Sequence, residues 1–277
     1  MLLKHYLAGV VLALCVISVS VVEAQSSLAE LLQRHGVQAK DGSLDEPFDA
    51  HATPAVPVTP GSLAMPLAVL TATDGSERIA GAYAFGILAG YSGRAASTEE
   101  LAAAGQALLL MVASDDRTSR VAGARVAGWI FAAPFDRSAP RPTVPVGMTA
   151  ALFALLNLDR DVDQLAAMDA LGLMREATAV GSLTERYAYY RDAEKRALAG
   201  GALEALARIG DQSTLKIVQQ LAGDRWSEGK DATALAVAFA RERLLKDGSI
   251  AVIRLAVDDK SRRNQARGYL AELGAVP

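Results

Sequence analysis

The sequence predicts an all-α protein whose helices pair into a stack of hairpins. Its 277 residues are 51% hydrophobic, mostly Ala, Leu and Val, and only 5% aromatic, a mixture that favours closely packed helices over β-sheets. Apolar residues recur at helical spacing over most of the chain. A helical motif with a small residue near its centre also recurs along the chain. These features predict a helical repeat protein.

Residues 1–24 have the features of a secretory signal peptide. Lys4 is followed by an apolar run that ends at Val22, and Val22 and Ala24 have the spacing of a V-x-A cleavage site. Cleavage there would leave Gln25 as the first residue of an exported, periplasmic or extracellular protein. The apolar run is near the lower length limit for a membrane span, so an uncleaved anchor is the alternative. We expect membrane contact only in that case.

Residues 25–67 are expected to form a short helix followed by a Pro-rich extended tether. The helix, from Gln25 to about Gly36, carries leucines at helical spacing along one face. Five prolines exclude a regular helix in the segment that follows: Pro47, Pro54, Pro57, Pro60 and Pro66. We expect the ordered array to occupy residues 68–277.

One small residue recurs at the same point of successive helices in this array. Aligning Gly86, Gly128, Gly172 and Ala207 gives steps of 42, 44 and 35 residues. A bulky side chain at such a point would hold two helices apart, so the pattern indicates close helix packing. These four positions are predicted to lie on the first helices of their hairpins.

The C-terminal half contains a second alignment. LKIVQQLAGD, from Leu215, aligns with IAVIRLAVDD, from Ile250, at a constant shift of 35 residues. Apolar residues fall at matching places in the two segments, as in two copies of one amphipathic helix. We interpret each segment as the second helix of a hairpin.

The stretch ALEALARIGDQSTLKIVQQLAGD, from Ala202 to Asp224, resembles a HEAT repeat of the short, phycobilisome-lyase type. Looser copies extend the resemblance over roughly residues 70 to 273. It implies a right-handed α-solenoid of about five to six HEAT-like hairpins, with first helices on the convex side and second helices on the concave side. In such families the concave groove commonly holds a protein partner, and the repeat carries no catalytic residues to transfer.

The sequence departs from the repeat pattern in two places. A Pro-rich insert at residues 134–145 stands where a compact repeat has a short turn. Residues 174–191 are expected to make the second helix of the third hairpin irregular. Two other second helices, beginning near Leu101 and Val146, are apolar nearly all round. They are either buried beneath the tether or the insert, or they form an apolar binding groove.

Composition argues against several classes of function. Lys and Arg number 28 against 31 Asp and Glu, so no strong field would attract nucleic acid. The single cysteine, Cys15, lies within the signal segment, and the histidines His5, His35 and His51 all precede the array. A thiolate site or a convergent histidine site on the array is therefore not expected.

Acidic residues offer no clear metal or catalytic site either. Asp159, Asp161 and Asp163 have the spacing with which calcium loops begin. Gln164 and Ala170 stand where such a loop needs Gly and Glu, so we interpret the aspartates as helix-capping residues. We predict no metal, no cofactor and no enzyme activity.

The leading hypothesis is a non-catalytic protein-binding scaffold of the cell envelope or exterior. The alternatives are an accessory subunit of an envelope enzyme or a lyase-like HEAT protein, and an N-terminally anchored structural protein of the envelope. Aromatic and charged side chains near the irregular regions and on second helices are the candidate contacts. The partner-binding candidates are Phe135, Arg137, Arg141, Tyr187, Tyr190, Arg191, Lys216, Gln219 and Arg254.

Overall fold

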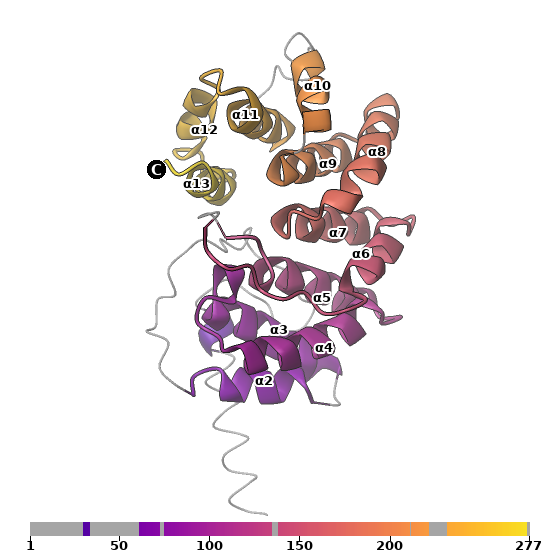
Figure 1. Ribbon diagram of the computed structural model, residues 1–277, viewed down its shortest axis with the longest axis vertical. Coiled ribbons are helices and arrows are strands. Elements are labelled where there is room, and N and C mark those ends of the chain that lie inside the picture. The colour runs from indigo at the N-terminus through magenta and orange to yellow at the C-terminus, as the bar shows by residue number, and fades with distance from the viewer. Residues whose placement is uncertain are drawn as a thin grey trace, which may run out of the picture.

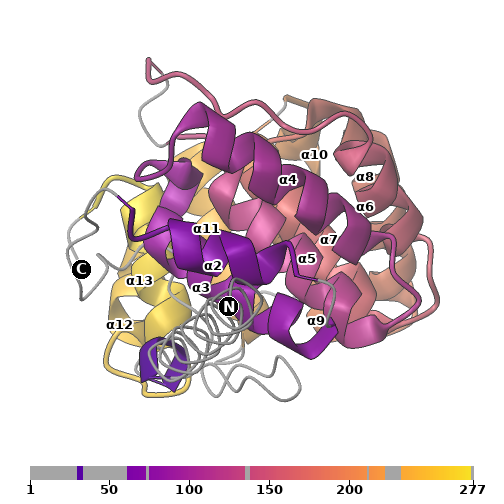
Figure 2. The same cartoon turned by 90° about the horizontal axis from the view of Figure 1, so that it is seen from below.

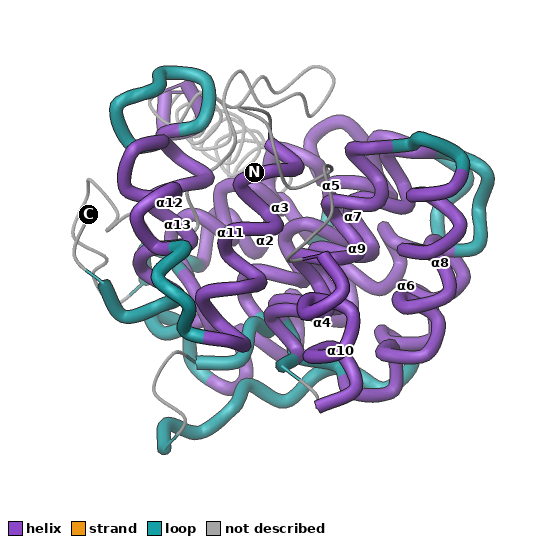
Figure 3. Tube along the Cα trace, turned by 90° about the horizontal axis from the view of Figure 1, so that it is seen from above, coloured by secondary structure: helices purple, strands orange, loops and turns teal. Residues whose placement is uncertain are grey.

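The computed structural model describes residues 30–33, 61–72, 75–134, 138–210, 212–221 and 232–275. Every regular element within these ranges is a helix, and no strand occurs among them (Figure 1). The prediction of an all-α protein is confirmed for this part of the chain. Figure 3 shows helices throughout, with loops confined to their ends. The signal segment and most of the tether lie outside the described residues.

The helices follow one another with short connections over most of the chain. They are α2 (Ala64–Leu70), α3 (Gly75–Ala89), α4 (Thr98–Val112), α5 (Arg117–Ile130), α6 (Met148–Leu156), α7 (Asp161–Leu173), α8 (Val180–Asp192), α9 (Arg196–Ile209), α10 (Gln212–Leu221), α11 (Ala232–Leu245), α12 (Ile250–Ala256) and α13 (Arg263–Glu272). Two short 3-10 helices, η1 (Tyr91–Gly93) and η2 (Ala177–Ala179), precede α4 and α8. Helix α2 begins at Ala64, within the segment expected to be tether.

The helices form a curved stack of two layers. Helices α3, α5, α7, α9 and α11 pack side by side in chain order and form the inner layer, while α2, α4, α6, α8 and α10 lie on the outside of the curve (Figure 1). Helices α12 and α13 pack on each other and follow α11 at the end of the described stack. Outer-layer neighbours pack less extensively on one another than inner-layer neighbours do. Because the inner layer holds the helices predicted to be convex, the expected assignment of the two layers is reversed.

The hairpins are also phased differently from the prediction. Helices α4, α6, α8 and α10 each pack more extensively on the helix that follows than on the helix before. The helix that begins near Leu215 was predicted to be the second helix of its hairpin. It belongs to α10, which packs chiefly on α11 and so opens a hairpin instead of closing one.

Small residues allow the inner-layer helices to approach closely. A Cβ atom built on Gly128 of α5 would lie 2.8 Å from the Cα of Ala170 on α7. One built on Gly172 of α7 would lie 2.7 Å from the Cα of Ala205 on α9. These separations are too short for a real side chain, so glycine is required at both crossings. The interpretation of the repeated small residues as packing positions is confirmed at Gly128 and Gly172, and at Gly86 an added Cβ would lie 3.1 Å from side-chain atoms of Trp129 and Val126 on α5. For Ala207 it stays a prediction.

The starts of α4 and α5 are capped by side chains. Asp116 accepts a hydrogen bond from the Ser119 amide at 2.6 Å at the start of α5. Ser97 and Glu100 form a reciprocal capping box at the start of α4. Asp163 is different, because its carboxylate is buried and pairs with Arg120. The capping interpretation is therefore wrong for Asp163.

The region expected to be irregular contains a regular helix. One 3-10 turn ends at Ala179, and α8 then runs without interruption from Val180 to Asp192. Its Leu183, Tyr187 and Tyr190 are buried and anchor it against the stack. Burial of one face explains why a segment with weak apolar periodicity still forms a helix.

The Pro-rich insert covers part of α4. A Cβ atom built on Gly105 of α4 would lie 2.9 Å from the ring of Phe131 and would also meet Pro145 of the insert. Figure 2 shows the loop that precedes α6 running alongside α4. Leu108 and Met111 of α4 are fully buried. The insert therefore covers the Gly105 side of α4, and Leu108 and Met111 lie against Gly123 of α5, while Leu110 of the same helix is 65% exposed, so α4 is only partly buried.

Candidate functional site

The C-terminal ends of the first inner-layer helices lie at one edge of the stack and are linked by hydrogen bonds. The Tyr91 hydroxyl, just after α3, donates to the Ala133 carbonyl at 3.0 Å, and the Ser92 hydroxyl donates to the Ala132 carbonyl at 2.7 Å. The Ala133 amide in turn donates to the Leu173 carbonyl of α7 at 2.8 Å. Each helix end thus satisfies carbonyl groups that have no partner within their own helix.

The same pattern continues between α9 and α11 through an arginine. Arg243, in the last turn of α11, donates from Nε to the Ala207 carbonyl at 2.7 Å and from Nη2 to the Arg208 carbonyl at 3.2 Å. A cation at these carbonyls also opposes the negative end of the α9 dipole. We call the row formed by Tyr91, Ala133, Leu173, Arg208 and Arg243 the C-terminal edge.

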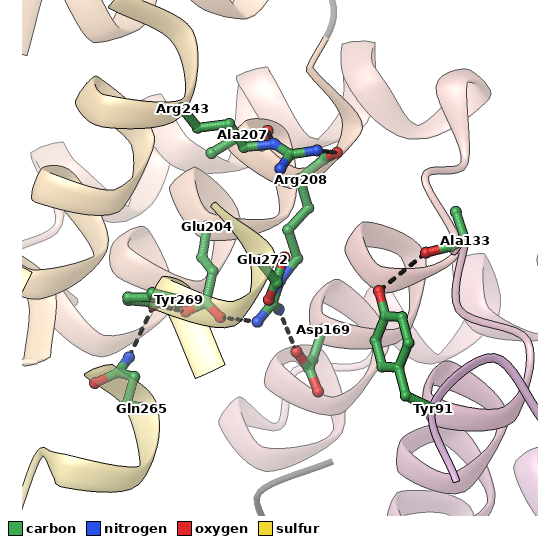
Figure 4. Close-up of polar contacts among 10 residues, drawn as sticks. All are labelled: Tyr91, Ala133, Asp169, Glu204, Ala207, Arg208, Arg243, Gln265, Tyr269 and Glu272. Carbon is green, nitrogen blue, oxygen red and sulfur yellow. Dashed lines mark hydrogen bonds and ion pairs between the residues drawn. The ribbon is translucent and has the colours of Figure 1, made fainter. Parts of the chain in front are cut away.

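A cluster of charged side chains surrounds Arg208 at this edge (Figure 4). The Arg208 side chain is 9% exposed, and its guanidinium pairs with Asp169 of α7 at 2.6 Å, with Glu204 of α9 at 2.6 Å and with Glu272 of α13 at 3.0 Å. The Glu272 side chain is only 4% exposed. A buried guanidinium requires such partners, because an unpaired charge in the interior is strongly destabilising. We call these four residues the Arg208 cluster.

Tyr269 of α13 joins the Arg208 cluster to the apolar core. Its hydroxyl donates to Glu204 and accepts a hydrogen bond from the Gln265 amide at 2.9 Å. Its ring stacks on Phe239 of α11, with centroids 4.2 Å apart and planes 14° apart. Helix α13 is therefore held to α9 by polar contacts and to α11 by an aromatic contact.

Burial and charge shift the titration of these groups. Burial raises the pKa of Glu204, and the neighbouring Arg208 opposes this shift. Burial also raises the pKa of the Tyr269 hydroxyl, and the charge of Glu204 adds to that effect. Burial lowers the pKa of Arg208, but the carboxylates of Glu204, Glu272 and Asp169 outweigh it and hold this pKa well above its usual value.

The arrangement fits a structural role better than a catalytic one. Glu204 directs one oxygen to Arg208 and the other to Tyr269, so neither oxygen is left for a substrate. Across the described ranges, no group of three or more His, Cys, Asp or Glu side chains is placed to hold a metal ion. The carboxylates of the cluster surround the Arg208 guanidinium, which occupies the place where a metal ion would have to bind.

The structure places the predicted partner-binding residues of α8 and the insert in different environments. Arg141 of the insert and Arg191 of α8 are exposed. Tyr187 and Tyr190 are only 5% and 1% exposed, so their rings belong to the core and offer no contact area to a partner. Tyr189, which lies between them and was not among the candidates, is 61% exposed.

The remaining candidates lie on α10 and α12, towards the C-terminus. Lys216 and Gln219 are exposed on α10, which packs on α8. Arg254 is exposed on α12 between two exposed apolar residues, Val252 at 45% and Leu255 at 75%. Val252 and Leu255 are three residues apart, so they lie on one face of the helix. This spacing can be read from the sequence. Phe135 and Arg137 lie outside the described residues.

Sequence reasoning missed the Arg208 cluster altogether. Asp169 and Glu272 lie 39 and 64 residues from Arg208, so no local spacing brings them together. The available signal was a pair of charged residues, Glu204 and Arg208, within an otherwise apolar helix. Charges at helical spacing in such a helix indicate a buried ion pair.

Comparisons with family models and with curated proteins match nothing to this chain. In the part of the chain that the structure describes, no helix is both long and apolar enough to cross a membrane. The apolar run of residues 1–24 lies outside that part.

Proposed function

We propose that this chain is a HEAT-like α-solenoid that serves as an exported, non-catalytic protein-binding scaffold. The two-layered curved stack and the repeated close crossings at Gly128 and Gly172 support the HEAT-like resemblance. The signal features of residues 1–24 support export. The partner is a protein, because the exposed candidates Arg141, Arg191, Lys216, Gln219 and Arg254 carry cationic and amide side chains, and exposed Tyr189 beside them adds an aromatic ring, a combination typical of protein interfaces.

The observation that carries the proposal is the contrast between the two layers. The inner-layer helices are buried almost all round, including every residue from Ala80 to Tyr91 and from Thr233 to Ala240. The outer helices α8 and α10 instead expose Tyr189, Lys216 and Gln219. A partner therefore meets the outer layer and the insert, in place of the concave groove that the resemblance implied. Exposed tyrosine supplies large contact area at a low entropic cost.

Affinity capture from native envelope extract tests the binding function. The chain from Gln25 onward is the bait, and the expected result is a defined protein that the bait retains at physiological salt. The variant Y189A/K216E is expected to lose this protein, and replacement of residues 138–143 by a Gly-Ser linker is expected to weaken its capture. Ala154→Ser, an exposed change on α6, is the matched control and retains it.

Two results would contradict the proposal. Capture of the same proteins by the bait, by Y189A/K216E and by the insert variant would exclude both surfaces. N-terminal sequencing of the natural protein tests export separately. Gln25 at the terminus agrees with cleavage, whereas Met1 supports the anchored alternative.

A further inference from the structure

We propose that the Arg208 cluster is a pH-sensitive clasp that holds α13 against α9 most tightly in mildly acidic solution. Helix α13 ends the described stack and reaches α9 through two polar contacts, Glu272 to Arg208 and Tyr269 to Glu204 (Figure 4). The cluster brings together carboxylates from α7, α9 and α13, so it joins three helices at one cation. Protonation within it therefore changes how firmly the C-terminal helix is held.

The cluster contains more negative than positive charge. Among these four residues three carboxylates share one guanidinium, and the side chains of Glu272 and Glu204 are 4% and 17% exposed, whereas that of Asp169 is 38% exposed. The groups that face Glu204 are Arg208 of its own helix, Asp169 of α7, and Tyr269 and Glu272 of α13. Arg243 of α11 faces the backbone carbonyls at the end of α9. Uptake of one proton relieves this excess.

Geometry identifies Glu204 as the group that takes the proton. Glu272 receives the Arg208 Nε hydrogen on both oxygens, at 3.0 and 3.2 Å, which favours its ionised form. Glu204 has only one oxygen on Arg208, and the other faces the Tyr269 hydroxyl. A proton on that second oxygen can be shared with the phenol without breaking the Arg208 contact. Burial favours the same neutral form, because it raises the pKa of Glu204.

The direction of the pH effect follows from the difference between docked and undocked α13. When α13 lifts away, Glu204 loses the cover of Tyr269 and the negative charge of Glu272, so its pKa falls towards the usual 4.5. The docked state then binds the proton more tightly than the undocked state. Docking gains stability as the pH falls through the docked pKa and loses it as the pH rises.

Hydrogen exchange of the full chain, followed by mass spectrometry of peptides from residues 263–275, tests the clasp. Protection relative to the intrinsic exchange rate is measured from pH 7.5 down to pH 4.5, the usual pKa of a glutamate. We expect protection of α13 to rise as the pH falls through the raised pKa of docked Glu204, by less than the limit of tenfold per pH unit for one proton. Glu204→Gln is expected to abolish this rise, and Glu185→Gln, at an exposed position of α8, is expected to keep it.

A second variant keeps the test decisive should Glu204→Gln fail to fold. Tyr269→Phe retains the ring that stacks on Phe239 but removes the hydroxyl that stabilises ionised Glu204. The midpoint of the pH profile is expected to move to higher pH, a change that a purely structural tyrosine would not cause. The proposal is overturned if α13 protection falls or stays constant on acidification in the natural sequence. It is also overturned if Glu204→Gln leaves the rise intact, or if Tyr269→Phe leaves the midpoint unchanged.

Discussion

Arg120 on α5 and Asp163 on α7 form a two-pronged ion pair between adjacent inner-layer helices. The Arg120 Nε lies 3.1 Å from one Asp163 oxygen, and Nη2 lies 3.2 Å from the other. The third nitrogen, Nη1, donates to the carbonyls of Ser114 and Asp115 at the turn before α5. The Asp163 side chain is fully buried. One arginine thus fixes the register of two helices and the conformation of a turn.

Removal of one partner from this pair is expected to destabilise the fold severely. Arg120→Met leaves the Asp163 carboxylate buried without its cation, and we expect the free energy of unfolding to fall by about 3 to 5 kcal/mol. The double variant R120M/D163L is expected to regain much of this loss, because neither charge then remains in the interior. Urea unfolding at neutral pH measures both values. Equal stability of Arg120→Met and the natural sequence would show that this pair is not buried.

Gly172→Leu is expected to force α7 and α9 apart. The Cβ position of Gly172 is only 2.7 Å from the Cα of Ala205, so the leucine must displace backbone atoms. We expect a loss of about 1 to 3 kcal/mol in the free energy of unfolding. Thermal and urea unfolding both report this change.

Gly181→Ala is the matched control for Gly172→Leu. Gly181 lies on α8, and a Cβ atom there would meet nothing within 4 Å. Alanine is expected to stabilise the helix by about 0.5 to 1 kcal/mol, because it loses less conformational freedom than glycine on folding. An unchanged melting temperature for Gly172→Leu would argue against close packing of α7 and α9.

Ser97→Ala is expected to cost about 1 kcal/mol through the loss of the N-cap of α4. The Ser97 hydroxyl accepts the Glu100 amide hydrogen at 3.2 Å, and the Glu100 carboxylate accepts the Ser97 amide hydrogen at 2.8 Å. Ser97→Asp keeps an acceptor at the same position, so its stability is expected to stay close to that of the natural sequence. A Ser97→Asp variant as unstable as Ser97→Ala would show that another contact of Ser97 matters more.

Tyr91→Phe is expected to loosen the junction between the first two inner-layer helices. The change removes the donor to the buried Ala133 carbonyl, at an expected cost of about 1 kcal/mol. Tyr189→Phe removes a hydroxyl from a side chain that is 61% exposed and is expected to be nearly neutral. Differential scanning calorimetry of the two variants compares the costs. Equal melting temperatures would contradict a structural role for the Tyr91 hydroxyl.

The helical class and the close crossings could be predicted because both depend on local patterns. Gly128 and Gly172 recur at one point of successive helices, and each meets a small residue of the next helix. The layer assignment could not be predicted in the same way. Whether a repeated helix lies inside or outside the curve depends on how tightly each row packs, which is a property of contacts between repeats.

The candidate partner-binding residues also divide into features that the sequence predicts and features that depend on packing. The sequence singled out aromatic and charged residues of α8, yet burial separates Tyr187 and Tyr190 from the exposed Tyr189. The three tyrosines share nearly the same stretch of sequence, so composition alone does not distinguish them. Their environments depend on the rotation of α8 against α9, which is set by packing across the hairpin. The Arg208 cluster was unpredictable for a related reason, because its members come from three separate repeats.

The hydrogen bonds along the C-terminal edge have a mechanical consequence. They join the ends of the inner-layer helices at 2.7 to 3.2 Å, and glycine crossings bring the same helices into backbone contact. The outer row has fewer contacts between its neighbours. We therefore expect the inner row to be the stiffer of the two, so that bending of the stack changes the spacing of the outer helices more than that of the inner ones.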